Sequence, residues 1–151
     1  VGEFFGAREK EEILTPIKTY GLEKYVICYG NQSGEALNNI FNQCDFAIGS
    51  LARHRSGITH IKTLKNREYA ARGFGFIYSE TDDDFEQKPY ILKVPADESP
   101  IDIPQLISFH QQLSLSPETI RNSIQHLSWK EQMKKVRKIK PGNFISRFYV
   151  I

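Results

Sequence analysis

The sequence predicts an α/β fold, an open parallel sheet with helices on both faces. Short apolar runs rich in β-forming residues alternate with segments in which apolar residues recur at helical spacing. Strands and helices that alternate in this way are typical of a parallel sheet. The 151 residues, 40% hydrophobic and 25% charged, suffice for one globular domain over 1–151 with a sizeable core.

The expected elements follow one another without an internal repeat or a low-complexity linker. In order, they are helix 8–20, strand 24–29, helix 33–44, strand 45–50, helix 64–72, strand 74–78, strand 90–94, helix 103–112, helix 117–126 and helix 129–139. The first helix has Ile13, Leu14 and Ile17 at helical spacing and stops at Gly21. The run KYVICY before Gly30 predicts a buried parallel strand.

The second helix has Ser33 as its N-cap and Leu37, Ile40 and Phe41 as its buried stripe. The run DFAIGS predicts the next strand, and a polar connection over 51–57 follows it.

The third helix and the strand after it form the joint around which the chain is organised. The helix stops at Gly73 and leads at once into the apolar run FGFIYS. An acidic loop over 81–85 comes next, and Pro95 ends the following strand. Such an αβ joint is expected to lie beside a functional edge of the sheet.

The last third of the chain is predicted to be helical. Asp102 or Ser99 caps one helix, and Ser116 followed by Pro117 opens the next. The last helix begins at Trp129 and is strongly basic. An apolar tail over 143–151 is expected to pack onto another surface.

Composition narrows the class of protein. The net charge of +2 does not indicate nucleic acid as a partner, and no apolar run reaches the roughly 20 residues of a membrane helix. No secretion signal is visible, so we expect a cytoplasmic protein. Cys28 and Cys44 are interpreted as reduced core residues rather than a disulfide. The abrupt start at Val1 suggests a fragment of a longer protein.

Open parallel sheets bind ligands outside the carboxyl ends of their strands. Here this rule selects the loops after Gly2, Tyr29, Ser50 and Ser79. None of these loops has a GxGxxG or Walker A pattern, which argues against an NAD enzyme or a phosphate-loop NTPase. GxSxG and HExxH are also missing. The acidic run at 82–84 is interpreted as a solvated loop rather than a cation site, and the scattered histidines form no ligand set, so no metal is expected.

Three motifs carry a resemblance to a known family. They are CDFAIGSL at 44–51, HRxG at 54–57 and LKxREYxARGxxFI at 64–77. Together they resemble the donor half of retaining, group-one glycosyltransferases of the two-domain GT-B architecture. The similarity runs from Val1 to about Gln112, and the helix at Trp129 resembles the closing segment. The resemblance implies a Rossmann-like sheet and an N-terminal acceptor domain outside this chain.

The resemblance also implies which residues contact the donor. Glu68 would lie at the ribose of the nucleotide sugar, and Lys65 would share its side of the helix. The family has an acid facing the sugar eight residues before Glu68, where this chain has His60.

Elementary chemistry agrees with this assignment. A sugar nucleotide needs backbone N–H groups for its diphosphate and a carboxylate for its two ribose hydroxyls. Gly57, Ile58, Thr59 and His60 precede the helix and could supply the N–H groups. The alternative for Glu68 is a surface ion pair with Arg72, four residues later. Lys65 can equally be a solvated helix residue.

The glycines near the start of the chain are further candidates. Gly30 and the residue after it, Asn31, could flank the base. Gly2 and Gly6 resemble a loop that faces the diphosphate. Simple turns account for all of these residues as well.

The implied reaction moves a sugar from a nucleoside diphosphate to a saccharide or lipid-linked glycan, as in polysaccharide biosynthesis. It would need no metal or cofactor, because backbone amides and a basic side chain stabilise the leaving diphosphate. No residue is assigned to the chemical step itself. The basic helix over 129–139 is either a solvated face or a peripheral contact with anionic lipid at the inner face of a membrane. The alternatives are a non-catalytic module that binds nucleotide or protein and a sugar-nucleotide epimerase.

Overall fold

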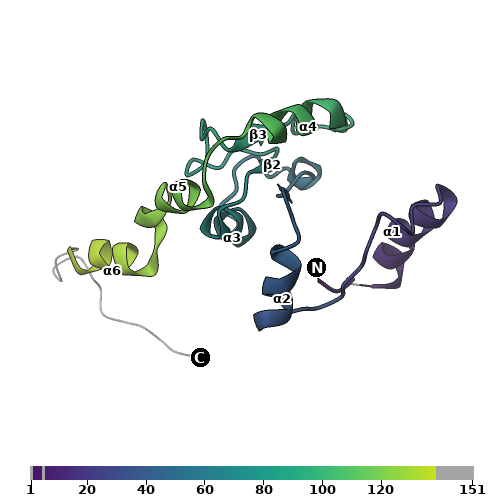
Figure 1. The fold of residues 1–151 in the computed structure, drawn as a ribbon, viewed down its shortest axis with the longest axis horizontal. Helices are drawn as coiled ribbons and strands as arrows, with labels where there is room; N and C mark the ends of the chain where they lie inside the picture. Colours follow the sequence, from purple (N-terminus) through teal and green to yellow (C-terminus); the bar gives the residue numbers. More distant parts are fainter. Residues whose placement is uncertain (1, 5, 139–151) are drawn as a thin grey trace. The chain divides into compact units, whose positions relative to one another are not determined.

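The computed structural model describes residues 2–4 and 6–138. The chain divides into two compact units, Val1–Cys44 and Asp45–Ile151. Figure 1 shows the helices and strands of both units. The predicted tail over 143–151 and the last residue of the predicted basic helix lie outside the described residues.

The first unit consists of helices and turns. Helix α1 spans Ala7–Thr19 and helix α2 spans Gly34–Phe41, so both helices predicted for this part of the chain are confirmed. Ser33 occupies the N-cap position of α2 with an extended backbone. Within 2–4 and 6–44, no described residue is buried. This unit therefore contributes no buried apolar residue to a core.

The strand predicted over 24–29 is wrong. The backbone N–H groups of Tyr25 and Val26 both donate to the carbonyl of Leu22, so the segment starts as a turn. It continues without any strand partner, and Tyr25 is 81% exposed. An apolar run becomes a strand only when a ladder satisfies its backbone groups, and the sequence does not show where that ladder would be.

The prediction for the cysteines is confirmed only in part. Cys28 and Cys44 are both free, as expected, but both are exposed rather than part of the core. Cys28 shares the exposed segment that lacks a strand partner. Cys44 lies past the end of α2, where its thiol donates to the carbonyl of Ile40 at 3.3 Å.

The second unit contains a three-stranded parallel sheet. Strand β1 spans Ala47–Ile48, β2 spans Phe76–Tyr78 and β3 spans Ile91–Lys93, in the order β1-β2-β3. Ala47 aligns with Phe76, and Phe76 aligns with Ile91. The predicted strands at 45–50, 74–78 and 90–94 are thus confirmed in position and direction, but each observed strand is shorter than predicted. The molecule is a mixed α/β protein.

Helix α3, Leu64–Arg72, connects β1 to β2. Thr63 caps its start by accepting a hydrogen bond from the Asn66 N–H, and Gly73 ends it with a left-handed φ of 86°. A Cβ atom added to Gly73 would also lie 2.5 Å from Pro117 Cβ. Pro117 begins the helix Pro117–Asn122, which packs on α3. The predicted stop at Gly73 is confirmed, and the cap at Thr63 was not predicted.

The remaining helices follow β3. Helix α4 spans Ile103–Gln112, α5 spans Pro117–Asn122 and α6 spans Trp129–Lys138, with Asp102 and Ser116 as the caps of the first two. The helix predicted over 117–126 is wrong in its second half. After Asn122 the chain continues as a 3₁₀ turn, η2, over Gln125–Leu127.

Aromatic residues form the centre of the core. Phe76 lies between Tyr69 of α3, Phe85 and Tyr90, at ring-centroid distances of 5.8, 5.4 and 6.2 Å. Ile120 of α5 belongs to the same buried cluster. Phe46, directly before β1, instead packs edge-on against Phe109 of α4 at 6.0 Å. This core fixes α3 and the strand ends beside it.

Candidate functional site

The start of α3 lies at the edge of the sheet where the strands end. A helix that connects two parallel strands begins at the carboxyl end of the first strand and returns to the start of the second. The backbone confirms this position, because His60 forms a parallel bridge with Thr81, shortly after β2. Ile61 N–H donates to the Thr81 carbonyl at 2.8 Å, and Thr81 N–H donates to the Thr59 carbonyl at 2.9 Å.

Glu68 lies on α3 with its side chain 45% exposed. Its Oε1 accepts a hydrogen bond from Arg72 Nε at 3.1 Å, so the predicted ion pair with Arg72 is present. Lys65 is exposed three residues earlier on the same helix. Residues three apart are neighbours on a helix surface, so Lys65 and Glu68 share a face of α3.

The segment before α3 uses some of its amides internally. Residues Arg53–Ser56 form a 3₁₀ turn, η1, and the N–H groups of Gly57 and Ile58 donate to carbonyls within it at 2.9 and 3.1 Å. The side chain of Thr59 lies 3.0 Å from His60 Nδ1. Of the four N–H groups expected to face the diphosphate, those of Gly57 and Ile58 therefore already have acceptors within the protein.

The candidate glycines at the start of the chain belong to the first unit. Gly30 has a left-handed φ of 67°, and its carbonyl accepts from the Gly2 N–H at 2.8 Å. Gly6 precedes α1, and its carbonyl accepts from Lys10 at 3.1 Å. Both residues lie within Val1–Cys44, where Gly6 is the N-cap of α1 and has an extended backbone.

Sequence reasoning missed Glu80, the second residue after the end of β2. Glu80 is 2% exposed, and its Oε1 accepts from the N–H groups of Arg53 and His54 at 2.6 and 3.1 Å. Its Oε2 accepts from the Ser79 hydroxyl at 2.8 Å. Burial by itself raises the pKa of Glu80, but these hydrogen bonds outweigh it and hold the pKa below its ordinary value. Glu80 thus ties the turn after β1 to the end of β2.

A second carboxylate holds the same turn from the loop after β3. Glu98 accepts from His54 Nε2 at 2.9 Å and forms a two-pronged ion pair with Arg55. Hydrogen bonds from Arg55, and then from His54, lower the pKa of Glu98 to about 2. The other ring nitrogen, His54 Nδ1, is buried and lies 3.9 Å from Glu80 Oε1. His54 therefore lies between two carboxylates.

The prediction of a solvated acidic loop at 82–84 is wrong for two of its residues. Asp82 is fully buried, and its carboxylate accepts from Arg67 and from Asn66 Nδ2 at 3.2 Å each. Asp84 forms an ion pair with the same guanidinium and has a side chain 21% exposed. A buried carboxylate needs a cation and donors around it, and α3 supplies them. Arg67, which belongs to the run LKxREYxARGxxFI, is thus a structural partner of this loop.

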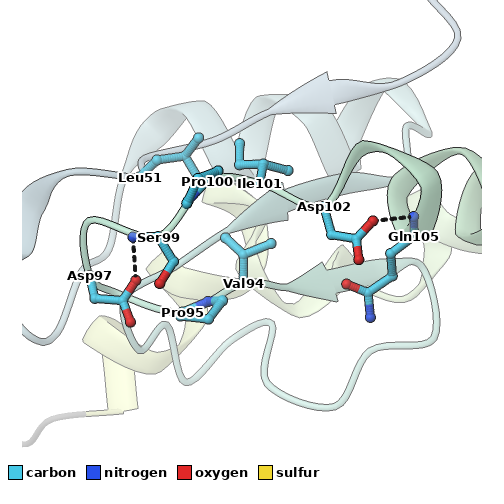
Figure 2. A pocket seen from close by; sticks show the side chains of 9 residues that line it. All are labelled: Leu51, Val94, Pro95, Asp97, Ser99, Pro100, Ile101, Asp102 and Gln105. Atoms are coloured by element: carbon cyan, nitrogen blue, oxygen red, sulfur yellow. Dashed lines mark hydrogen bonds between the residues drawn. The ribbon is translucent and has the colours of Figure 1, made fainter.

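A pocket opens at the carboxyl ends of β1 and β3. Its volume is about 220 Å³, and Figure 2 shows the side chains that line it: Leu51, Val94, Pro95, Asp97, Ser99, Pro100, Ile101, Asp102 and Gln105. The two carboxylates accept hydrogen bonds from the N–H groups of Ser99 and Gln105 at 2.8 and 2.9 Å. With two carboxylates and no cationic side chain in its lining, this pocket does not suit a phosphate group.

Comparisons of the chain with protein-family models, curated proteins and solved structures find no match. Within residues 2–4 and 6–138, no group of three or more His, Cys, Asp or Glu side chains is arranged to hold a metal ion. No helix in that part of the chain has both the length and the apolar character needed to cross a membrane.

The structure brings some of the predicted site residues together. His60, Thr59, Ile58, Gly57, Lys65 and Glu68 all lie on α3 or on the chain leading into it. Gly6 and Gly30 lie in the other unit. The missed residues, Glu80 and Asp82, lie two and four residues after the end of β2. Their burial depends on donors from other segments, the Arg53 and His54 N–H groups for Glu80 and Arg67 for Asp82.

Proposed function

We propose that this chain is the donor-binding half of a retaining glycosyltransferase, built on a Rossmann-like sheet. It would bind a nucleoside-diphosphate sugar and pass the sugar to a saccharide or lipid-linked glycan held by an acceptor domain. The observation that carries the proposal is the position of the family motif. The motif helix, α3, connects two adjacent parallel strands and starts at their carboxyl edge, where such sheets bind ligands.

Contacts on the two sides of the sheet support the Rossmann-like architecture. Tyr69 of α3 packs on Phe76, whereas Phe109 of α4 packs on Phe46 beside the neighbouring strand. Phe46 precedes Ala47, which aligns with Phe76, and successive side chains of a strand point to opposite faces. Helices therefore contact both faces, as expected for one half of a GT-B enzyme.

The proposed donor site assigns a task to each side chain on the exposed face of α3. Glu68 would accept from the two ribose hydroxyls, exchanging its bond to Arg72 for charge-assisted bonds to the ligand. The backbone near His60 and the ammonium of Lys65 would face the diphosphate, whose departure they would stabilise. His60 would lie near the sugar.

Replacement of Glu68 by Gln tests this assignment. The change keeps the shape of the side chain but removes its charge, so binding of a nucleoside diphosphate should weaken by about 1.5 kcal/mol, roughly tenfold in Kd. The thermal midpoint should change little, because an exposed i,i+4 ion pair contributes only about 0.3 to 0.5 kcal/mol. Calorimetric titration of UDP, GDP and ADP measures both affinity and base preference.

Glu131→Gln is the matched control. Glu131 lies on α6 and pairs with Lys134 three residues later, so its replacement removes a similar surface ion pair far along the chain. We expect this variant to bind nucleotide as the unmodified chain does. Equal affinities of all three proteins would show that Glu68 is only the partner of Arg72.

The alternative is a non-catalytic α/β module that binds nucleotide or protein. Two observations favour it: Glu68 is already paired with Arg72, and the Gly57 and Ile58 amides already have acceptors. In such a module the sheet is retained and the acid expected at His60 has been lost. Absence of nucleotide binding to the unmodified chain at millimolar concentration would favour this second function.

A further inference from the structure

A second pocket, distinct from that of Figure 2, lies between the segment entering α3, the loop after β2, η2 and α6. Its volume is about 390 Å³, within the range of small-molecule sites. Lys62 comes from the segment before α3, Asp84 from the loop, His126 from η2 and Lys135 from α6. Four separate parts of the chain thus converge on one hollow.

The hollow is held in shape by contacts of its own lining. Gln132 of α6 donates through Nε2 to the His126 carbonyl at 2.6 Å, which fixes the first turns of α6 against η2. On the opposite side, Arg67 bonds to the Thr63 carbonyl at 3.0 Å, to buried Asp82 and to Asp84. The position of each wall is therefore set by hydrogen bonds within the second unit.

The side chains of the pocket that could bind a charged ligand carry a net positive charge. The guanidinium of Arg67 is committed to its two carboxylates, which it partly neutralises. Lys62 and Lys135 are exposed, and within residues 2–4 and 6–138 neither forms a close ion pair, although the charge of Lys135 helps to lower the pKa of Glu131. Two ammonium groups with three donors each thus line the pocket, together with an imidazole and a carboxylate that can still accept hydrogen bonds.

We propose that this pocket binds a phosphomonoester that also carries hydroxyl groups. Lys62 and Lys135 would hold the phosphate from two sides, and Asp84 would accept from a hydroxyl. The site is separate from the proposed donor site, because Arg67 and Glu68 are successive residues of a helix and point about 100° apart. It therefore stands or falls independently of the proposed nucleotide binding.

The phosphomonoester can be a free metabolite or a lipid headgroup. Helix α6 carries Lys130, Lys134 and Arg137 in addition to Lys135, so its surface would be attracted to an anionic membrane. Glycerol 3-phosphate and vesicles that contain phosphatidic acid present the same chemical group in these two forms. Phosphatidylcholine vesicles serve as the neutral reference.

The test is titration of the full chain with both probes, by calorimetry for glycerol 3-phosphate and by co-sedimentation for vesicles. In the double variant K62Q/K135Q, affinity for the probe that binds should fall about tenfold or more, since both charge-assisted contacts are lost. K130Q/K134Q is the matched control. It removes the same total charge, two lysines, without touching the pocket, so it should retain binding of glycerol 3-phosphate.

The outcomes separate the possibilities. If glycerol 3-phosphate binds the unmodified chain and the K62Q/K135Q variant loses this binding, the proposal is supported and the ligand is a soluble metabolite. If only the phosphatidic acid vesicles bind and K62Q/K135Q loses this binding, the proposal is supported and the ligand is a lipid headgroup. Equal losses in both double variants would show diffuse attraction and overturn it, as would failure of both probes to bind. Loss of phosphate binding in E68Q would overturn the separation from the donor site.

Discussion

Single buried carboxylates organise the edge of the sheet where the motif helix begins. Glu80 receives two backbone N–H groups from η1 and the Ser79 hydroxyl, and it is almost completely buried. Hydrogen bonds to an ionised group contribute more than neutral ones, and leaving buried donors without an acceptor costs their full desolvation. Glu80 therefore positions the turn that leads to Gly57 and His60.

We predict that Glu80→Ala destabilises the chain by about 3 kcal/mol, because two backbone donors lose their acceptor inside the structure. Urea unfolding followed by circular dichroism measures this change. Glu98→Ala provides the comparison, since Glu98 binds the same turn from an exposed position, and it should have a far smaller effect. Similar losses in the two variants would contradict the role given to burial.

The pH dependence of this contribution has a definite sign. Because the pKa of Glu80 is lower in the folded chain than its ordinary value, its stabilising effect is present above about pH 4.3 and is lost as the pH falls through the folded pKa. The difference in unfolding free energy between the unmodified chain and Glu80→Gln should thus shrink below about pH 4. A difference that stays constant from pH 7 to pH 3 would rule out an ionised Glu80.

Among the elements, α3 depends on the glycine that ends it. Gly73 combines a left-handed φ of 86° with the close approach of Pro117. Gly57 has a similar φ of 68° but no heavy atom within 4 Å of the position of a side chain. The two glycines separate the cost of backbone conformation from the cost of packing.

We expect Gly73→Ala to destabilise the chain by about 3 kcal/mol, of which roughly 1 comes from the backbone and the rest from overlap with α5. Gly57→Ala should cost only about 1 kcal/mol. Thermal or urea unfolding of the two variants gives the comparison. If both variants lost the same stability, the contact between Gly73 and Pro117 would have no energetic role.

Helix ends could be predicted from the sequence, whereas strand pairing could not. Caps and stops are local, so the sequence could predict the helix ends at Gly73, Asp102 and Ser116, which the structure confirms. Strands depend on a partner that the sequence does not name, which is why the apolar run over 24–29 forms no ladder whereas the run around Ile77 does. The burial of Asp82 was missed for a related reason, since it depends on Arg67 from another element.

At the scale of the whole chain, the described core belongs to the second unit. The buried apolar cluster includes residues from Ala47 to Ile124, whereas no described residue of the first unit is buried. The predicted site has the same division, because Glu68 and His60 belong to the unit with the core and Gly6 and Gly30 to the other. Nucleotide binding by α3 is therefore expected to rest on a stable framework.

The most direct test of the account is amide hydrogen exchange of the unmodified chain with and without the nucleoside diphosphate that binds best. Exchange reports on each backbone segment, so it locates the ligand as well as detecting it. We predict slower exchange across 57–72, the segment that holds His60 and Glu68, and no change across 94–105 around the pocket of Figure 2. Slower exchange confined to 94–105, or none at any segment under saturating nucleotide, would contradict a donor site on α3.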